Sequence, residues 1–147
     1  MRKNLLKLSA IALTFVAFTT SCTEEEKPAT PSIVGNWEIN KVLFTMSDSA
    51  TNILLFGDTT IYAAGEFMLD FKSNNMVIST EKDGTDVYID TSYYSISDKT
   101  LKIAETPDMM DASELKIETL TATDVKLTVN EFDEGTKWYQ EITGKRK

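Results

Sequence analysis

The strongest constraint on the fold is an alternation of apolar and polar residues with a period of two, which begins near Ile33. Within residues 65–72, for example, Phe67, Leu69 and Phe71 occupy every second position. Such alternation is typical of antiparallel β-strands that place one face on a core and the other in solvent. The pattern predicts eight strands, over residues 33–45, 65–72, 76–82, 85–96, 100–105, 114–120, 124–131 and 136–144.

Short turn sequences separate these predicted strands, among them Ser73-Asn74-Asn75 and Asp83-Gly84, whose residue types tolerate tight bends. Eight strands joined mainly by tight turns favour an all-β fold, an eight-stranded antiparallel up-and-down barrel, because closure removes exposed strand edges. An eight-stranded β-sandwich is the alternative, since it has the same period. A short helix near residues 49–56 is the one predicted exception.

The composition excludes several classes of site. The chain has no histidine and one cysteine, which excludes a Cys/His zinc site, an internal disulfide and a Ser-His-Asp triad. A formal charge of −8 disfavours nucleic acid as a partner, because phosphates would be repelled. An enzyme would need paired carboxylates on the inner face, but the alternation places Glu38 and Asp90 outward and no acid inward. We therefore expect no catalysis, no cofactor and no bound metal.

The first residues form a targeting segment. A basic leader precedes an apolar run over residues 8–18, which is typical of a secretory signal peptide and too short to span a bilayer. Three small residues then lead to Cys22. This junction resembles the lipobox of bacterial lipoproteins, which implies cleavage before Cys22 and its acylation, for example with palmitate. Residues 1–21 are then the signal peptide, 22–32 a lipidated, acidic and Pro-rich tether, and 33–147 the barrel domain.

The acidic run Glu24-Glu25-Glu26 begins two residues after that cysteine, with Thr23 between them. It resembles the export signal that sends some Gram-negative lipoproteins to the outer face of the outer membrane. The resemblance implies a lipid-anchored outer-membrane protein exposed at the cell surface, with the periplasmic face as the alternative. Its first partner would be the lipid bilayer, through the acylated Cys22.

The first predicted strand carries a second motif, Gly35-Asn36-Trp37. It resembles the G-x-W motif at the start of the first strand in the lipocalin family, and the strand pattern is similar to that of lipocalin-like domains of bacterial lipoproteins. The resemblance implies that Trp37 packs across the barrel base under a late basic residue, which Lys145 or Arg146 could supply. It also implies a barrel that holds a small ligand.

Two long connections, over residues 46–64 and 106–113, fall at one end of an up-and-down barrel because successive connections alternate between the ends. We expect them to form an entrance, whose candidate residues are Leu55, Phe56, Tyr62, Met109 and Met110. The alternative is that these side chains merely plug the barrel. Many acids gather at the same end, so neutral apolar or cationic molecules would enter more readily than anions.

The inward positions provide candidates for the lining of a ligand cavity. These candidates are Ile39, Phe67, Leu69, Phe71, Tyr93, Leu127 and Trp138. Val87 and Ile89 are expected on the same inner face. The expected function is binding of a small apolar or neutral ligand by a cell-envelope lipoprotein. The alternative is a filled-barrel structural or interaction lipoprotein that contacts a protein or envelope partner through its loops.

Overall fold

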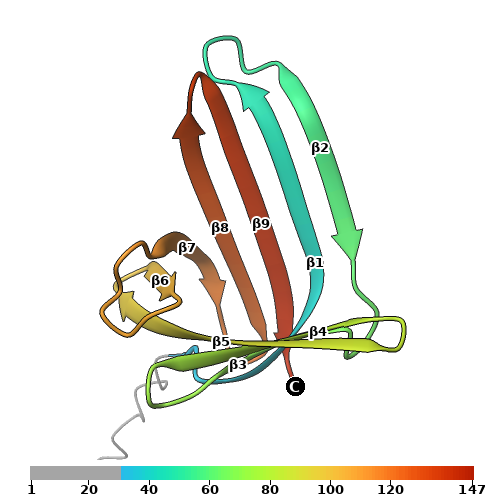
Figure 1. Cartoon of the computed structure of the whole chain (residues 1–147), viewed down its shortest axis with the longest axis vertical. Helices are drawn as coiled ribbons and strands as arrows, with labels where there is room; N and C mark the ends of the chain where they lie inside the picture. Colours follow the sequence, from blue (N-terminus) through green and yellow to red (C-terminus); the bar gives the residue numbers. More distant parts are fainter. Residues whose placement is uncertain (1–30) are drawn as a thin grey trace, which may run out of the picture.

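The computed structural model describes residues 31–147, so the predicted signal peptide, Cys22 and nearly all of the tether lie outside the described residues. The described part contains strands and no helix (Figure 1). Its nine strands are β1 (Gly35–Asp48), β2 (Leu54–Ile61), β3 (Phe67–Phe71), β4 (Met76–Asp83), β5 (Asp86–Ser97), β6 (Thr100–Ala104), β7 (Ser113–Leu120), β8 (Asp124–Asp133) and β9 (Thr136–Arg146).

Eight of these strands form a closed antiparallel barrel, which confirms the predicted fold class and excludes the sandwich. Each strand from β3 to β9 pairs with the next, and β1 pairs with both β3 and β9. All eight predicted strands are present, and their ends lie within three residues of the predicted ones. Among residues 31–147 we find no helix with the length and apolar character needed to cross a bilayer.

The ninth strand, β2, corrects the prediction of a long loop with a short helix. β2 pairs with the upper part of β1, from Lys41 opposite Ile61 to Ser47 opposite Leu54, while β3 occupies the same edge of β1 lower down. Asp48 stabilises the turn between β1 and β2, because its carboxylate accepts hydrogen bonds from Thr51 N at 2.7 Å and Thr51 Oγ1 at 2.6 Å. The result is a hairpin, and no helix forms.

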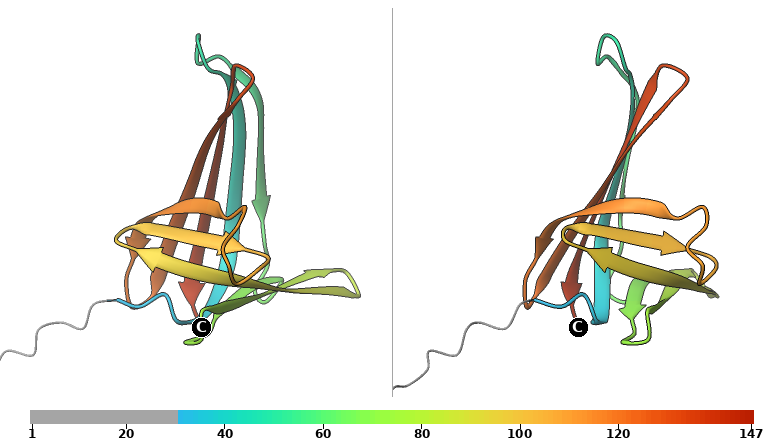
Figure 2. Two further views of the ribbon diagram at one scale, coloured as in Figure 1. Left: turned by 60° about the vertical axis from the view of Figure 1, so that its left-hand side comes forward. Right: turned by 90° about the vertical axis from the view of Figure 1, so that its left-hand side faces the viewer.

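Four neighbouring strands extend beyond the ring (Figure 1). In Figures 1 and 2, β2, β1, β9 and β8 rise side by side away from the C-terminus, while β5, β6 and β7 cross near the base. A bulge at Asn40 interrupts the β1–β9 register. Because a bulge inserts one residue, Trp37 and Ile39 below it share the inner face with Val42 and Phe44 above it.

The packed core lies at the base of the barrel. Its largest fully buried side chains are Trp37, Phe71, Ile39, Leu101 and Leu127. Phe67 and Leu69 pack against this cluster while remaining partly exposed. The alternation predicted for β1, β3 and β8 is therefore correct at these positions.

Along β5 the predicted alternation is wrong by one residue. Val87 and Ile89 are 53% and 65% exposed, whereas Tyr94 is 5% exposed. The Tyr94 hydroxyl donates to Lys72 O at 2.7 Å, and its ring meets Phe71 edge-on with centroids 5.1 Å apart. These contacts turn Tyr94 inward, so that neighbouring Tyr93 lies on the outer face.

The same phase places Asp90 on the inner face. Asp90 pairs with Ser79, and two residues further along Ser92 pairs with the buried Val77. Because alternate residues share a face, the prediction that Asp90 faces outward is wrong. The apolar pattern gave the wrong inner face here because the outer part of the β4–β5 hairpin is exposed on both faces. Without a core on one side, the apolar residues of this hairpin need not lie on the inner face.

Candidate functional site

The G-x-W residues lie at the barrel base. Arg146 is the cross-strand partner of Trp37, and its guanidinium carbon lies 4.4 Å from the centroid of the Trp37 ring. Arg146 Nη1 donates to Val34 O at 2.8 Å, and Nη2 donates to Ser32 O at 2.5 Å. Trp37 Nε1 donates to Ile33 O at 2.7 Å. Arg146 therefore links β9 to residues 32–34, the segment that precedes β1.

Gly35 makes this arrangement possible. Its φ of +135° disfavours other residues, and a Cβ there would lie 2.5 Å from Arg146 Nη1. Lys145, the other predicted cation, is exposed and lies opposite Glu38 in the β1–β9 register, on the outer face. Of the two basic residues, the structure brings Arg146 alone onto Trp37.

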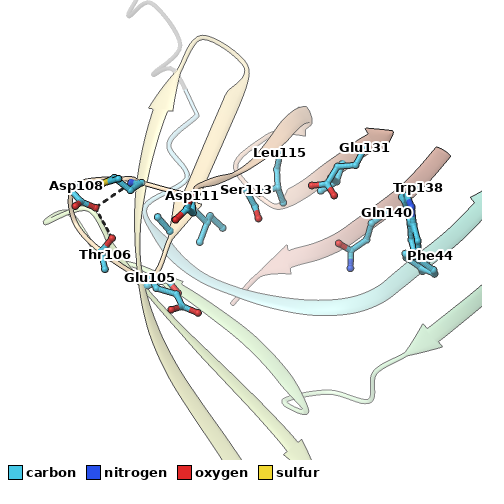
Figure 3. Close-up of a pocket in the computed structure, with 15 residues that line it drawn as sticks. Phe44, Glu105, Thr106, Asp108, Asp111, Ser113, Leu115, Glu131, Trp138 and Gln140 are labelled. Atoms are coloured by element: carbon cyan, nitrogen blue, oxygen red, sulfur yellow. Dashed lines mark hydrogen bonds between the residues drawn. The ribbon is translucent and has the colours of Figure 1, made fainter. Parts of the chain in front are cut away.

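A cavity of about 850 Å³ lies above the packed core and opens to solvent (Figure 3). Its walls come from β1, β8 and β9 on one side and from the end of β6, the following loop and the start of β7 on the other. Ile103, Leu115 and Val129 supply its lower apolar surface. The barrel is thus packed at the base and hollow above.

One wall of the cavity is aromatic. Phe44 and Trp138 both line it, with ring centroids 5.3 Å apart and planes inclined by 49°. Phe56 of β2 continues the aromatic row, 6.0 Å from Phe44 between centroids. Trp138 is 36% exposed, which leaves part of its indole surface open to a ligand.

The cavity also carries carboxylates, and one of them, Glu131, lies in a strand, contrary to the expectation that no strand acid faces inward. Glu105, Asp108 and Asp111 line it from the β6–β7 connection, and Glu131 lines it from β8. Figure 3 shows these side chains around the hollow, with Phe44 and Trp138 together at one side. Among residues 31–147, no lysine or arginine contributes to the lining.

Asp108 is held in its ionised form by local hydrogen bonds. Its carboxylate accepts from Thr106 Oγ1 at 2.6 Å and from Met110 N at 3.2 Å. The Thr106 hydrogen bond, followed by that from Met110, lowers the pKa of Asp108 below its usual value.

The four lining acids are spread around the hollow, and residues 31–147 contain no group of three or more potential ligand side chains placed to hold a metal.

The predicted lining and entrance residues are distributed over several places. Trp138 and Met110 line the cavity, whereas Ile39, Phe71 and Leu127 are buried in the base beneath it and Tyr93 faces outward. Met109 does not contribute to this lining, but it has a φ of +58° in the same connection.

The remaining entrance candidates lie on or beside β2. Leu55 and Phe56 belong to β2 and are 56% and 50% exposed. Tyr62, just after β2, packs on Phe67 with centroids 5.1 Å apart and donates to Glu81 Oε1 at 3.2 Å. Burial and then Glu81 raise the pKa of Tyr62.

Sequence reasoning missed Phe44, and it placed Glu131 among the acids at the entrance end without assigning it to the inner face. The alternation of β8 does contain a signal for Glu131, because it lies two and four residues beyond the inward Val129 and Leu127. Phe44 is hidden by the bulge at Asn40, which shifts the phase of β1 without any marker residue such as glycine.

A second hollow of about 720 Å³ lies at the base. Residues 31–34, Tyr94 and Ile96 of β5, the β5–β6 turn at residues 98–99 and the end of β7 at residues 117–120 surround it. It is the more open of the two hollows, and it lacks the paired aromatic wall of the first.

Comparison with known proteins finds solved structures that are similar to this chain. No protein-family model matches the sequence, and no curated protein matches it. The chain is similar to a lipocalin-like protein from Bacteroides uniformis ATCC 8492, with 15% identity and a TM-score of 0.46, over 78% of this chain and 96% of that one. It is also similar to an uncharacterized protein from Bacteroides eggerthii DSM 20697, with 13% identity and a TM-score of 0.44, over 78% and 99%.

Proposed function

We propose that this protein binds a small, largely apolar ligand in the cavity above its packed base and does not transform it. The observation that carries the proposal is the open hollow of about 850 Å³ with Phe44 and Trp138 on its wall. Small-molecule sites of proteins occupy roughly 300–1,000 Å³ and combine apolar walls with a few polar groups. Exposed Met110 at the rim offers an adaptable contact for ligands of different shape.

The proposal places this binding domain in the cell envelope. Support comes from the sequence alone: the apolar leader, the lipobox-like residues before Cys22 and the acidic run that follows. Acyl chains on Cys22 would anchor the barrel to the outer membrane, with the cell surface as the proposed location.

A cavity-filling variant tests ligand binding. Ser113 lines the hollow from an exposed position of β7, so Ser113→Trp should fill space without disturbing the core. Glu114 follows on the outer face, opposite Lys102, which makes Glu114→Trp the matched control. The neutral fluorophore N-phenylnaphthylamine should bind the full chain and Glu114→Trp with saturation, and should bind Ser113→Trp at least about tenfold more weakly.

Equal binding by both variants, or no saturable binding by the unmodified chain, would overturn the proposal. Circular dichroism of the two variants establishes that each has folded. Because only Ser113→Trp reduces the volume of the hollow, its effect separates cavity binding from adsorption to exposed apolar side chains.

A second candidate function, interaction with a protein partner, is favoured by β2. Every residue of β2 is exposed, including Leu54 at 63% and Ile61 at 69%, and the strand pairs with β1 alone. A free apolar edge can accept a strand from another protein. A photoreactive residue at position 55 should then crosslink a partner in cells, whereas one at exposed Lys99 should not. Identical patterns at both positions would rule out this function.

A further inference from the structure

We infer that the ligand is an organic cation, a small aromatic or apolar molecule that carries an ammonium group. The inference rests on the proposed ligand-binding function and narrows it to one chemical class. The volume and the aromatic wall indicate a ligand with apolar surface. The distribution of charge around that wall indicates the sign of its polar group.

Several carboxylates outside the cavity are paired with lysines. Glu118 and Glu141 are two examples: Lys116 Nζ lies 2.8 Å from Glu118 Oε1, and Lys126 Nζ lies 2.7 Å from Glu141 Oε2. The hydrogen bonds from these lysines are the first cause of a lowered pKa in both acids. These two outer-face acids are therefore matched by cations of the protein itself.

The carboxylates that line the cavity have no such match. Within the described 31–147 segment, Glu105, Asp108, Asp111 and Glu131 form no ion pair with lysine or arginine. The lysines and arginine thus lie outside the hollow while four acids line it. An anion entering it would be repelled from several sides, whereas a cation would be attracted.

One of these acids stands beside the aromatic wall. Glu131 and Trp138 are direct cross-strand partners on β8 and β9, and both line the cavity. Side chains at such positions have Cβ atoms about 4.5–5.5 Å apart. An ammonium group over the indole would therefore lie within reach of the Glu131 carboxylate, so a cation–π contact and an ionic contact can form together.

The arrangement fits an organic cation better than a metal ion. The four carboxylates come from opposite walls, and no trio of potential ligand side chains within 31–147 is close enough to hold a metal. A molecule that places apolar atoms on Phe44 and Trp138 can direct a charged group toward Glu131 without displacing water from all four acids.

A matched series of ligands tests the sign of the charge. Naphthylmethylammonium, naphthylmethanol and naphthylacetate share one ring system and differ in charge. Calorimetric titration of the full chain at low salt should give the ammonium about tenfold tighter binding than the alcohol, with no measurable binding of the acetate. Raising salt to about 1 M, where screening acts within about 3 Å, should remove most of that preference.

The variant Glu131→Gln tests the site while preserving side-chain shape. Glu131 is exposed, so the variant should fold. It should weaken the ammonium about fivefold, as expected for loss of one solvent-accessible ionic contact, and leave the alcohol unchanged. Glu114→Gln, which removes the same charge from the outer face of β7, should change neither.

Each result is decisive for one of the two proposals. Equal affinity for the ammonium and the alcohol, or an ammonium affinity that Glu131→Gln does not change, would overturn the cation inference and leave ligand binding intact. Failure of all three compounds to bind, together with failure of the neutral fluorophore, would overturn the proposed function itself.

Discussion

We predict that, among the side chains at the barrel base, Arg146 makes the largest polar contribution to stability. The variant Arg146→Met keeps the stem over Trp37 but removes the guanidinium and its hydrogen bonds to Val34 O and Ser32 O. Loss of the cation–π contact should cost about 0.5–2 kcal/mol. Each hydrogen bond should contribute about 1 kcal/mol, because the freed carbonyls can bind water. The free energy of unfolding should therefore fall by roughly 2.5–4 kcal/mol.

Urea denaturation followed by circular dichroism measures this loss. With a slope of about 1.5 kcal/mol per molar urea, the midpoint should fall by roughly 1.7–2.7 M. Arg146→Lys keeps the charge but loses the forked geometry, so its midpoint should lie between those of Arg146→Met and the unmodified chain.

Lys145→Met is the matched control, because it removes one positive charge from the adjacent exposed position of β9. It should change the unfolding free energy by less than about 0.5 kcal/mol. If Arg146→Met and Lys145→Met shift the midpoint equally, the base is held by strand pairing and the packing of Trp37, and the role assigned to the guanidinium is wrong.

Three further predictions concern other parts of the chain. Gly144→Ala should lower the unfolding free energy by about 1–3 kcal/mol in the same assay, because a Cβ would lie 2.9 Å from a backbone oxygen of β1. An equal midpoint would refute that clash. Lys126 lowers the pKa of Glu141 in the folded state, so stability should be lost as pH falls below about 4.5; urea midpoints of Glu141→Gln should show a shallower loss. Cys22→Ser should abolish incorporation of a palmitate analogue in growing cells, whereas persistent labelling would contradict lipidation at that residue.

The barrel could be predicted from sequence because burial on one face imposes a visible period. In β3 and β8 the inner residues are apolar and their neighbours are mostly polar, so both position and phase were correct. β2 could not be found in this way. All eight of its residues are exposed, and a strand with no buried face has no reason to alternate.

The candidate site was harder to predict because it depends on local irregularities. The bulge at Asn40 changes which residues of β1 face inward, and the register of β5 puts Tyr94 inside in place of Tyr93. The choice of Arg146 over Lys145 follows from cross-strand pairing with Trp37, which a single sequence does not contain. Trp138, expected on the inner face, and Met110, expected in an entrance loop, both line the cavity.

The position of β2 at the edge of the sheet predicts that it is locally less stable than the closed ring. β1 closes the ring by pairing with β3 and β9, and β2 takes no part in this closure. β2 pairs with β1 alone, and none of its residues is buried. Separating it from β1 would therefore expose little new apolar surface, and its amides should exchange with solvent long before those around Trp37. β2 can therefore separate from β1 by local unfolding while the ring around Trp37 stays closed.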